Sequence, residues 1–586
     1  MSSSADTPTE DQPVPDEMIP HKNLPPLLYK QMPDSIPWRK MIGPSILLAG
    51  LSLGSGEFVL WPYITFKSGF VFFWACLLGV ITQYFVNMEI ERYTLVTGET
   101  AITGFCRLSK HWAWIMLLMN IIPWAWPGWA TGAGSMLSWT LFGPEPTATV
   151  RLDEDAFAAL KTTALPSEVT VDDSKQTISW TGTMTSEDAA GWHTQLGSLP
   201  ESTEISDGIR TLRSNLEQGT GLTYTARYNE IFGIAGLILV GLVLTAGPVV
   251  YNTVEKIQFV LVGIVFFCAI VLGIFLIKPY AVEAMLAGLV NFGEMPNAAS
   301  GLGTMTLLGA LAFAGAGGSM NLSQSNFIMD KGYGMGKYIG RITSPLTGQE
   351  EPISQTGFHF PHDEENMARW QGWWRGANIE HFLSFFVTCF GCILLLTLIA
   401  YSMFYNEDGE LIAGADQYGS GLNFIWGQAS IIKSEFGSFP QYLFMIMGAT
   451  ILLTTELGVL DATARISADI VKVNYLRTND RFSVSRLYFM FLWGEIFLGS
   501  VILLYSQFDA TFKQPLVLLT ISAAMNGGVM FLYSIVLLYL NSKILPRSIS
   551  ITPLRFVILI WACAFFGYFT LQAFQIEIWP YFSEGG

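Results

Sequence analysis

One carboxylate stands inside an apolar stretch that glycines interrupt. Residues 43–63 read GPSILLAGLSLGSGEFVLWPY, in which Gly54, Ser55 and Gly56 come directly before Glu57. A charge in the middle of a membrane helix costs roughly 2.5–3.5 kcal/mol on insertion, and irregular backbone is tolerated there only where it lines a cavity or site. The pattern therefore predicts a helix opened near its middle, whose carbonyl oxygens and Glu57 bind a cation. A packing face of small residues is the simpler alternative, but packing does not require Glu57.

A second apolar stretch, residues 303–329, carries a similar interruption. Its glycines at 315–318 (GAGG) are followed by several polar side chains. Four uninterrupted stretches separate the two interrupted ones, which is what a five-plus-five inverted repeat predicts when its two helix breaks face each other. The residues predicted to complete the site around Glu57 are Gly315, Gly318, Asn321 and Gln324.

Other apolar stretches also contain ionisable residues. Glu456 follows two threonines, and a buried carboxylate can carry protons near neutral pH, although helix–helix hydrogen bonding is an alternative role. Asp461 lies four residues before Arg465, so the two can pair on one helix face. The candidates for coupling are Glu456, Asp461 and, on weaker grounds, Glu495. Glu89, Glu91 and Arg92 cluster near the end of the second stretch, where an ion-pair network or gate is more typical than ligand binding.

Composition places the chain in a membrane. Of its 586 residues 51% are hydrophobic and only 13% are charged, whereas soluble domains carry about 25% charged residues. The net charge of −16 and the lack of a basic patch exclude a nucleic-acid-binding function. The six cysteines lie in or beside apolar stretches, so no disulfide framework is expected, and Cys389 and Cys392 are expected to pack rather than to do redox or zinc chemistry.

Eleven apolar stretches are long enough to cross a bilayer, taking ~20 residues as the requirement. They lie near residues 42–66, 70–96, 112–142, 229–250, 256–278, 303–329, 377–404, 440–470, 484–506, 514–541 and 552–577. Lys and Arg concentrate in the connections on the side of the N-terminus, while the short connections on the other side hold only Lys67, Lys278, Lys433 and Lys513. The positive-inside rule therefore places the N-terminus in the cytoplasm and, with an odd number of spans, the C-terminus outside a plasma or inner membrane.

The predicted fold class is an all-α polytopic membrane protein with about 11 transmembrane helices. It is a 5+5 inverted repeat with broken helices 1 and 6, plus a small α+β external insertion. In that insertion DEDAFAALK is predicted to be helical, and SEVTVDD and KQTISWTGTMT are predicted to be paired strands. The expected domains are a disordered cytoplasmic tail (1–40), helices 1–3 (41–142), the external insertion (143–228), helices 4–6 (229–329), a cytoplasmic loop insertion (330–376) and helices 7–11 (377–586).

The interrupted stretches resemble the NRAMP family of proton-coupled divalent metal transporters, which have the leucine-transporter-like inverted-repeat fold. That family opens its first span with Gly-Pro, here Gly43-Pro44, and places a DPGN motif on the positions of residues 54–57. ERYTLVTGE in the second span resembles the family's ARLGIVTG, and Asn321-Leu322 matches the end of its A-x-x-M-P-H-N-L pattern. The resemblance covers the membrane part and implies a divalent cation as the transported substrate.

Three positions depart from the family pattern. The metal-binding aspartate is replaced by Gly54, the asparagine by Glu57 and the methionine by Gly318. Thioethers favour soft or borderline metals, whereas sites made of oxygen alone suit Mg²⁺, Ca²⁺ or Mn²⁺. The departures therefore predict a wider site, altered toward hard cations such as Mg²⁺ or Mn²⁺.

The sequence thus predicts a secondary active transporter of divalent metal cations, with proton symport as one option. No enzyme motif and no ATP-binding loop occurs in a usable context, so neither catalysis nor a cofactor is expected. The expected partners are the transported metal ion and the lipid bilayer, and the oligomeric state is left open. Two alternatives remain at this stage, namely a transporter of a small organic solute on the same scaffold and a non-transporting receptor that uses the external insertion.

Overall fold

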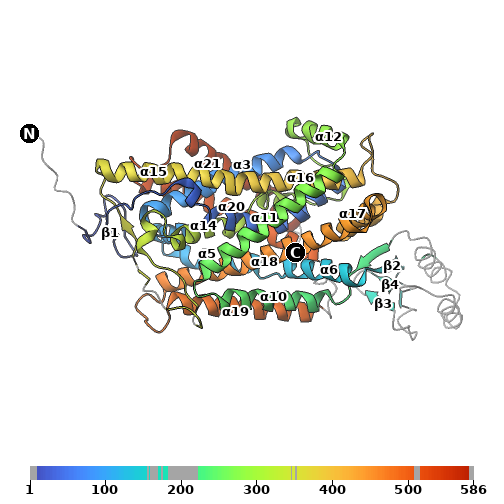
Figure 1. Cartoon of the computed structure of the whole chain (residues 1–586), viewed down its shortest axis with the longest axis horizontal. Coiled ribbons are helices and arrows are strands. Elements are labelled where there is room, and N and C mark those ends of the chain that lie inside the picture. Colours follow the sequence, from blue (N-terminus) through green and yellow to red (C-terminus); the bar gives the residue numbers. More distant parts are fainter. Residues whose placement is uncertain are drawn as a thin grey trace, which may run out of the picture.

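The chain forms a bundle of long helices, with the N-terminal segment at one end and the strands of the insertion at the other (Figure 1). This computed structural model describes residues 10–152, 154, 157–158, 169–172, 176–181, 211, 222–344, 346–349, 353–354, 356–506 and 515–579. Within them, nine continuous helices are long and apolar enough to cross a membrane. Two further predicted spans, the third and the sixth, are interrupted and lie in the same bundle, so the expected set of eleven is present.

The observed spans follow the predicted ones closely. In chain order they are α1–η2–α2 (Pro44–Ser52, Leu53–Leu60, Trp61–Ser68), α3 (Phe73–Thr97), α5–η3–α6 (His111–Ile121, Ile122–Trp124, Gly128–Phe142), α10 (Asn229–Ala246), α11 (Val250–Leu276), α13–α14 (Thr304–Ala312, Gly318–Lys331), α15–η6–α16 (Glu364–His381, Phe382–Val387, Thr388–Phe404), α18 (Ser438–Asn474), α19 (Val484–Tyr505), α20–η9 (Pro515–Tyr539, Leu540–Ile544) and α21–η10 (Pro553–Ala573, Phe574–Ile578). Shorter helices connect them: η1 (Trp38–Lys40), α4 (Ala101–Leu108), α12 (Pro279–Val290), η4 (Ala298–Ser300), η5 (Gly334–Tyr338), η7 (Ala415–Tyr418) and α17 (Asn423–Phe436). The seventh span begins earlier than predicted because Asp363 caps α15, accepting a 2.8 Å hydrogen bond from the Asn366 amide.

The first span differs from the prediction of a broken helix. It stays helical from Pro44 to Ser68, but Leu53–Leu60 is a π-helix, wider than the α-helices on either side. The sixth span is broken as predicted, between Ala312 and Gly318. The third span has an interruption that the sequence analysis did not predict, at Pro123–Pro127, where proline removes backbone donors.

The prediction of a disordered N-terminal tail is wrong for residues 10–40. Strand β1 (Leu28–Tyr29) pairs in parallel with β6 (Phe358–His359), which belongs to the predicted loop insertion at 330–376. Four apolar side chains of the segment, Val14, Ile19, Leu27 and Tyr29, form a small core. The Met32 amide donates to Asn366 Oδ1 at 2.7 Å, which fastens the segment to α15. Enough apolar surface is therefore buried to order these residues, whereas residues 1–9 lie outside the described part.

The insertion at 143–228 contains a four-stranded antiparallel sheet of order β3-β4-β2-β5. Its strands are β2 (Glu145–Arg151), β3 (Val169–Asp172), β4 (Thr177–Thr181) and β5 (Leu222–Thr225). The pairing of β3 with β4 confirms the predicted hairpin. The predicted helix at 153–161 lies mostly outside the described residues. In Figure 1 this sheet and the N-terminal segment with β1 occupy opposite ends of the helix bundle.

Candidate cation site

A threonine of the eighth span opens the first span. The Gly54 amide, which an α-helix would pair with the Gly50 carbonyl, instead donates to Thr455 Oγ1 at 2.8 Å. The same hydroxyl donates to the Gly50 carbonyl at 3.2 Å, so one side chain stands between two consecutive turns of the helix. A side chain inserted into the backbone ladder and a π-helical turn are recognised ways to distort a helix, and π-turns are frequent at functional sites.

Glu57 lies directly after this opening and is fully buried. Its Oε1 accepts a hydrogen bond from the hydroxyl of Ser52, five residues earlier, which is the spacing that a π-helix brings to one face. Its Oε2 has no hydrogen-bond partner in the structure. Burying a carboxylate with an unpaired oxygen is costly unless a proton or a cation joins it, so this position is chemically poised. Ser55 is also buried in η2, on the turn before Glu57.

A glutamine of the second span holds the break of the sixth span. Gln83 Nε2 donates to the carbonyls of Leu311 and Ala312, at 3.2 and 2.8 Å, which are the last free acceptors of α13. Gln83 Oε1 accepts from the Gly317 amide at 3.4 Å and from Asn321 Nδ2 at 3.3 Å. The polar groups that a break exposes are thereby satisfied by a neutral side chain. The sequence analysis missed both Gln83 and Thr455, although a glutamine in the middle of an apolar span is a visible signal.

The two opened spans meet at Gly56. A Cβ atom on Gly56 would lie 1.4 Å from the Phe313 carbonyl oxygen, so only glycine permits this approach of η2 to the break. Gly317 and Gly318 have φ of +76° and +52°, a left-handed conformation that glycine adopts without strain. Trp124 of the interrupted third span donates to Ser319 Oγ at 2.8 Å, and its ring lies 5.7 Å from the Phe313 ring, centroid to centroid. The interruptions of spans 1, 3 and 6 therefore converge on one place.

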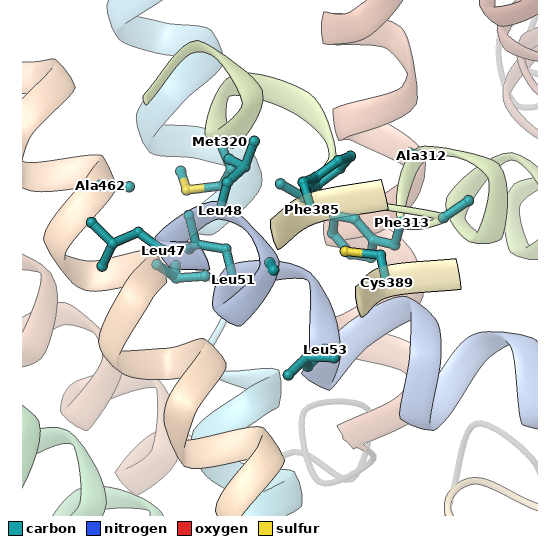
Figure 2. Packing of buried hydrophobic residues seen from close by; sticks show 14 of the residues in the cluster. Leu47, Leu48, Leu51, Leu53, Ala312, Phe313, Met320, Phe385, Cys389 and Ala462 are labelled. Atoms are coloured by element: carbon teal, nitrogen blue, oxygen red, sulfur yellow. The ribbon is translucent and has the colours of Figure 1, made fainter. Parts of the chain in front are cut away.

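Figure 2 shows the same place from the apolar side. Phe313 from the break, Phe385 and Cys389 belong to the same buried cluster as Leu51 and Leu53 of the first span, and Met320 of α14 is drawn above Leu48. These labelled side chains are buried, so the polar groups described above sit in a dry, apolar surround. Electrostatic interactions are stronger in such a surround than in water.

The structure divides the predicted ligands into two groups. Gly54, Gly56 and Glu57 lie at the opening, and the close contacts of Gly315 with Gln83 and Phe385 place it in the facing break. Gly318 begins α14 against Asn526 of α20, and Asn321 Nδ2 donates to Tyr533 at 3.0 Å. Gln324 lies further along α14, where its Nε2 donates to Ser45 and Glu91. Ser45 and Glu57 are twelve residues apart on one helix, about 18 Å at 1.5 Å per residue, so Gln324 does not share the surroundings of Glu57.

A second buried polar cluster surrounds Ser45. Its hydroxyl donates to Glu380 Oε2 and lies 2.8 Å from His381 Nδ1, both in the seventh span. Gln324 Nε2 connects Ser45 to Glu91 of the second span, at 3.3 and 3.4 Å. Glu380 and His381 were not predicted as site residues, although both lie inside the predicted seventh span (377–404); their partner Ser45 comes from the first span.

The predicted network of Glu89, Glu91 and Arg92 is split by helix geometry. Glu89 and Arg92 form a two-pronged ion pair, with distances of 2.8 and 3.1 Å, and Arg555 of α21 adds a contact to Glu89 at 3.2 Å. Two residues along a helix correspond to about 200° of rotation, so Glu91 points away from this network and toward Gln324. These contacts show the ion pair between Glu89 and Arg92, and its role as a structural network or gate stays a prediction.

The predicted pairing of Asp461 with Arg465 is also confirmed, at 2.9 Å. Arg465 also pairs with Asp330 at the end of α14, and Tyr488 of α19 donates to Asp461 at 2.7 Å. Asp330 and Arg465 line a cavity of about 380 Å³ that reaches the loops after α14 and α18. This buried ion cluster therefore stands between that cavity and the helix openings deeper in the bundle.

Glu456 and Glu495 face each other across a small cavity beside the interruption of the third span. One oxygen of each carboxylate, Glu456 Oε2 and Glu495 Oε1, has no partner. The cavity of about 20 Å³ has room for about one water molecule.

His359 and His362 of the loop insertion lie against each other, and His359 also contacts the second span. His359 Nδ1 lies 2.9 Å from the Val96 carbonyl and its Nε2 lies 3.0 Å from His362 Nε2. Burial lowers the pKa of His359 to about 3, so the imidazole is neutral at physiological pH. Within the described residues no group of three or more His, Cys, Asp or Glu side chains is arranged to hold a metal ion. A cation site in this part of the chain must therefore include hydroxyl, amide or backbone oxygens.

Comparisons with known proteins agree on the fold. No protein-family profile matches the chain. An uncharacterized protein of Pasteurella multocida is 29% identical over 84 residues, which span 14% of this chain and 18% of that protein. Crystal structures of two variants of a manganese transporter from Eremococcus coleocola each align over 93% of this chain and 88% of theirs, with TM-scores of 0.56 and 0.55 and identities of 11% and 12%. The chain therefore has the fold of these two transporter structures, the NRAMP-like fold predicted from its sequence.

Proposed function

We propose that this chain is a secondary active transporter that moves divalent metal cations across a membrane, with protons as the coupled ion. Its N-terminus is cytoplasmic and its C-terminus lies outside, as the distribution of Lys and Arg indicates. The transported ion belongs to the class of Mg²⁺ and Mn²⁺, and it binds where the first and sixth spans meet.

The observation that carries this proposal is the environment of Glu57. The carboxylate is fully buried, one of its oxygens has no partner, and it follows a helix opening that faces a second helix opening. A buried anion in that situation is stabilised by a cation more than by any neutral ligand. The structural neighbours that share the fold are manganese transporters, which supports a divalent ion as the substrate.

The backbone around the site supplies the remaining oxygen ligands. The Gly50 carbonyl is held by Thr455, and the Leu311 and Ala312 carbonyls are held by Gln83. These hydrogen bonds satisfy the openings when no ion is bound. A cation that reaches Glu57 replaces these neutral donors at the carbonyl oxygens. Binding of the cation is therefore linked to a rearrangement of the two spans.

Separate groups serve exit and coupling. The ion cluster of Asp330, Arg465 and Asp461 closes the path from the site to the 380 Å³ cavity, and opening this cluster releases the cation toward the loops after α14 and α18. The facing carboxylates of Glu456 and Glu495 are suited to hold one proton between them, because two such charges repel strongly in a low-dielectric cavity.

Uptake into proteoliposomes tests the proposal. Purified wild-type protein is compared with Glu57→Gln for Mn²⁺, Mg²⁺ and Ca²⁺, with and without an inward pH gradient. Glu283→Gln, which neutralises an exposed carboxylate of α12, is the matched control. Uptake that is lost in Glu57→Gln and kept in Glu283→Gln is expected. If folded wild-type protein takes up none of these ions, the metal-transport proposal is wrong and an organic solute becomes the better candidate.

A further inference from the structure

A thiol lies at the carboxylate of the candidate site. Cys389, in the first turn of α16, has its sulfur 3.2 Å from the hydroxyl oxygen of Ser52, the same hydroxyl that donates to Glu57. Figure 2 shows this sulfur pointing toward the first span, next to Phe313 of the break. Glu57, Ser52 and Cys389 therefore form one contiguous group that joins the first and seventh spans.

Two further observations make this more than a buried cysteine. Glu57 Oε2 is fully buried without a partner, so the group has an unused anionic oxygen beside the sulfur. A π-helix contains or adjoins each part of the group: η2 contains Glu57 and begins directly after Ser52, and η6 ends at Val387, two residues before Cys389. Single π-turns inside α-helices are frequent at functional sites.

The surroundings add sulfur rather than positive charge. Cys76 of α3 and Cys392, one turn after Cys389, are buried within electrostatic range of Glu57. A lysine or arginine here would neutralise Glu57, and none is among the residues that interact with it. A carboxylate with a thiol one hydroxyl away suits a softer metal better than it suits Mg²⁺.

We propose that Cys389 is a sulfur ligand of the transported cation, so that Glu57, Ser52 and Cys389 together favour a divalent transition metal, which takes sulfur ligands more readily, over Mg²⁺. This inference rests on the proposed function and narrows its substrate class. When the metal binds, the sulfur–hydrogen bond is replaced by a sulfur–metal bond, and the thiol proton leaves to the water on the side from which the metal came. The sulfur that the sixth span lacks at Gly318 is thus supplied by the seventh span.

Cadmium provides a direct probe, because a Cd²⁺–thiolate bond absorbs in the ultraviolet. Purified full-length protein is titrated with CdCl₂ or MgCl₂, and the absorption is compared among wild type, Cys389→Ser and Cys106→Ser. Cys106 is a buried thiol in α4, remote from Glu57, and serves as the matched control. The band is expected with Cd²⁺ in wild type and in Cys106→Ser, and it is expected to fall in Cys389→Ser.

Competition with Mn²⁺ uptake in proteoliposomes gives the second readout. Because even partners outside the first ligand shell change metal affinity by 10- to 100-fold, loss of a direct ligand should weaken competition by Cd²⁺ at least about tenfold. Competition by Mg²⁺ should change far less, because a serine hydroxyl is an acceptable oxygen ligand for it.

The outcomes separate this inference from the proposed function. Absence of the Cd²⁺–thiolate band in folded wild-type protein overturns the inference, whether or not transport occurs. An unchanged ratio of Cd²⁺ to Mg²⁺ competition in Cys389→Ser also overturns it, while leaving metal transport intact. A band that depends on Cys389 in a protein without divalent uptake supports the ligand role and refutes transport instead. The absorption band of wild-type protein is measured without any variant, so this first test holds even if a variant fails to fold.

Discussion

Replacing Thr455 by valine tests whether the first span is held open by one hydroxyl. Valine has nearly the same shape as threonine but cannot form the hydrogen bonds to the Gly54 amide (2.8 Å) and the Gly50 carbonyl (3.2 Å). Each buried backbone group left unpaired costs about 1–3 kcal/mol, so Thr455→Val should lower the free energy of unfolding by about 2–6 kcal/mol if the opening persists.

The neighbouring threonine is a matched control. Thr454 is equally buried, but its hydroxyl has no hydrogen-bond partner. Thr454→Val removes the same atom at the same depth and should be neutral or slightly stabilising, because an unsatisfied polar group is replaced by a methyl group. The difference between the two variants therefore isolates the inserted hydroxyl.

A second outcome of Thr455→Val is also informative. If the Gly54 amide pairs with the Gly50 carbonyl, the π-helix rewinds by one residue and stability recovers. Rewinding turns Glu57 by about 100°, away from Ser52 and Cys389, so uptake of Mn²⁺ should then be lost. Equilibrium unfolding in mixed detergent and SDS micelles, together with proteoliposome uptake, measures both quantities. If Thr455→Val matches Thr454→Val in stability and in uptake, the hydroxyl does not hold the span open and the reasoning fails.

Two further predictions concern other positions. Gln83→Leu leaves the Leu311 and Ala312 carbonyls without a donor and should lower the unfolding free energy by about 2–6 kcal/mol in the same micelle assay; wild-type stability would show that the break needs no such partner. His359 binds a proton in the unfolded chain below pH 6.5 but in the folded protein only near pH 3, so stability should fall as pH falls through this window, by about 2 kcal/mol at pH 5. Unfolding at pH 7.5 and pH 5 for wild type and His359→Gln measures that difference, and equal pH dependence of the two proteins contradicts it.

Much of the fold could be predicted from the sequence because a bilayer constrains it so strongly. Apolar stretches of sufficient length must become helices there, and their observed bounds differ from the predicted ones mostly by a few residues. The seventh span is the exception, because the amphipathic segment that begins at Glu364 and contains Arg369 and Trp370 does not read as a membrane helix. Its first half instead packs against the N-terminal segment, to which Arg369 and Trp373 donate hydrogen bonds.

The site was less predictable because its partners come from distant parts of the chain. Glycines near Glu57 indicate an opening but not its form, since the same residues suit an unwound loop and a π-helix. The form depends on Thr455, about four hundred residues away, which no local pattern connects to Gly54. In the same way, the predicted ligands all lie in spans 1 and 6 and offer only oxygen atoms, whereas the sulfur of Cys389 belongs to span 7.

Thr455 and Gln83 perform the same task in the two facing spans. Each is a neutral side chain from an unbroken helix, and each bonds both the donors and the acceptors of an opening. In a membrane, the backbone groups freed by a helix opening must be paired in every state. When no ion is bound, other groups must therefore form hydrogen bonds with them. Hydroxyl and amide groups can donate hydrogen bonds to the carbonyl oxygens that a cation would otherwise bind. Because these groups are neutral, a cation can replace them at low cost in free energy. The two side chains therefore let both spans stay open in the absence of the cation, which leaves Glu57, and not the backbone, as the group whose charge decides whether an ion binds.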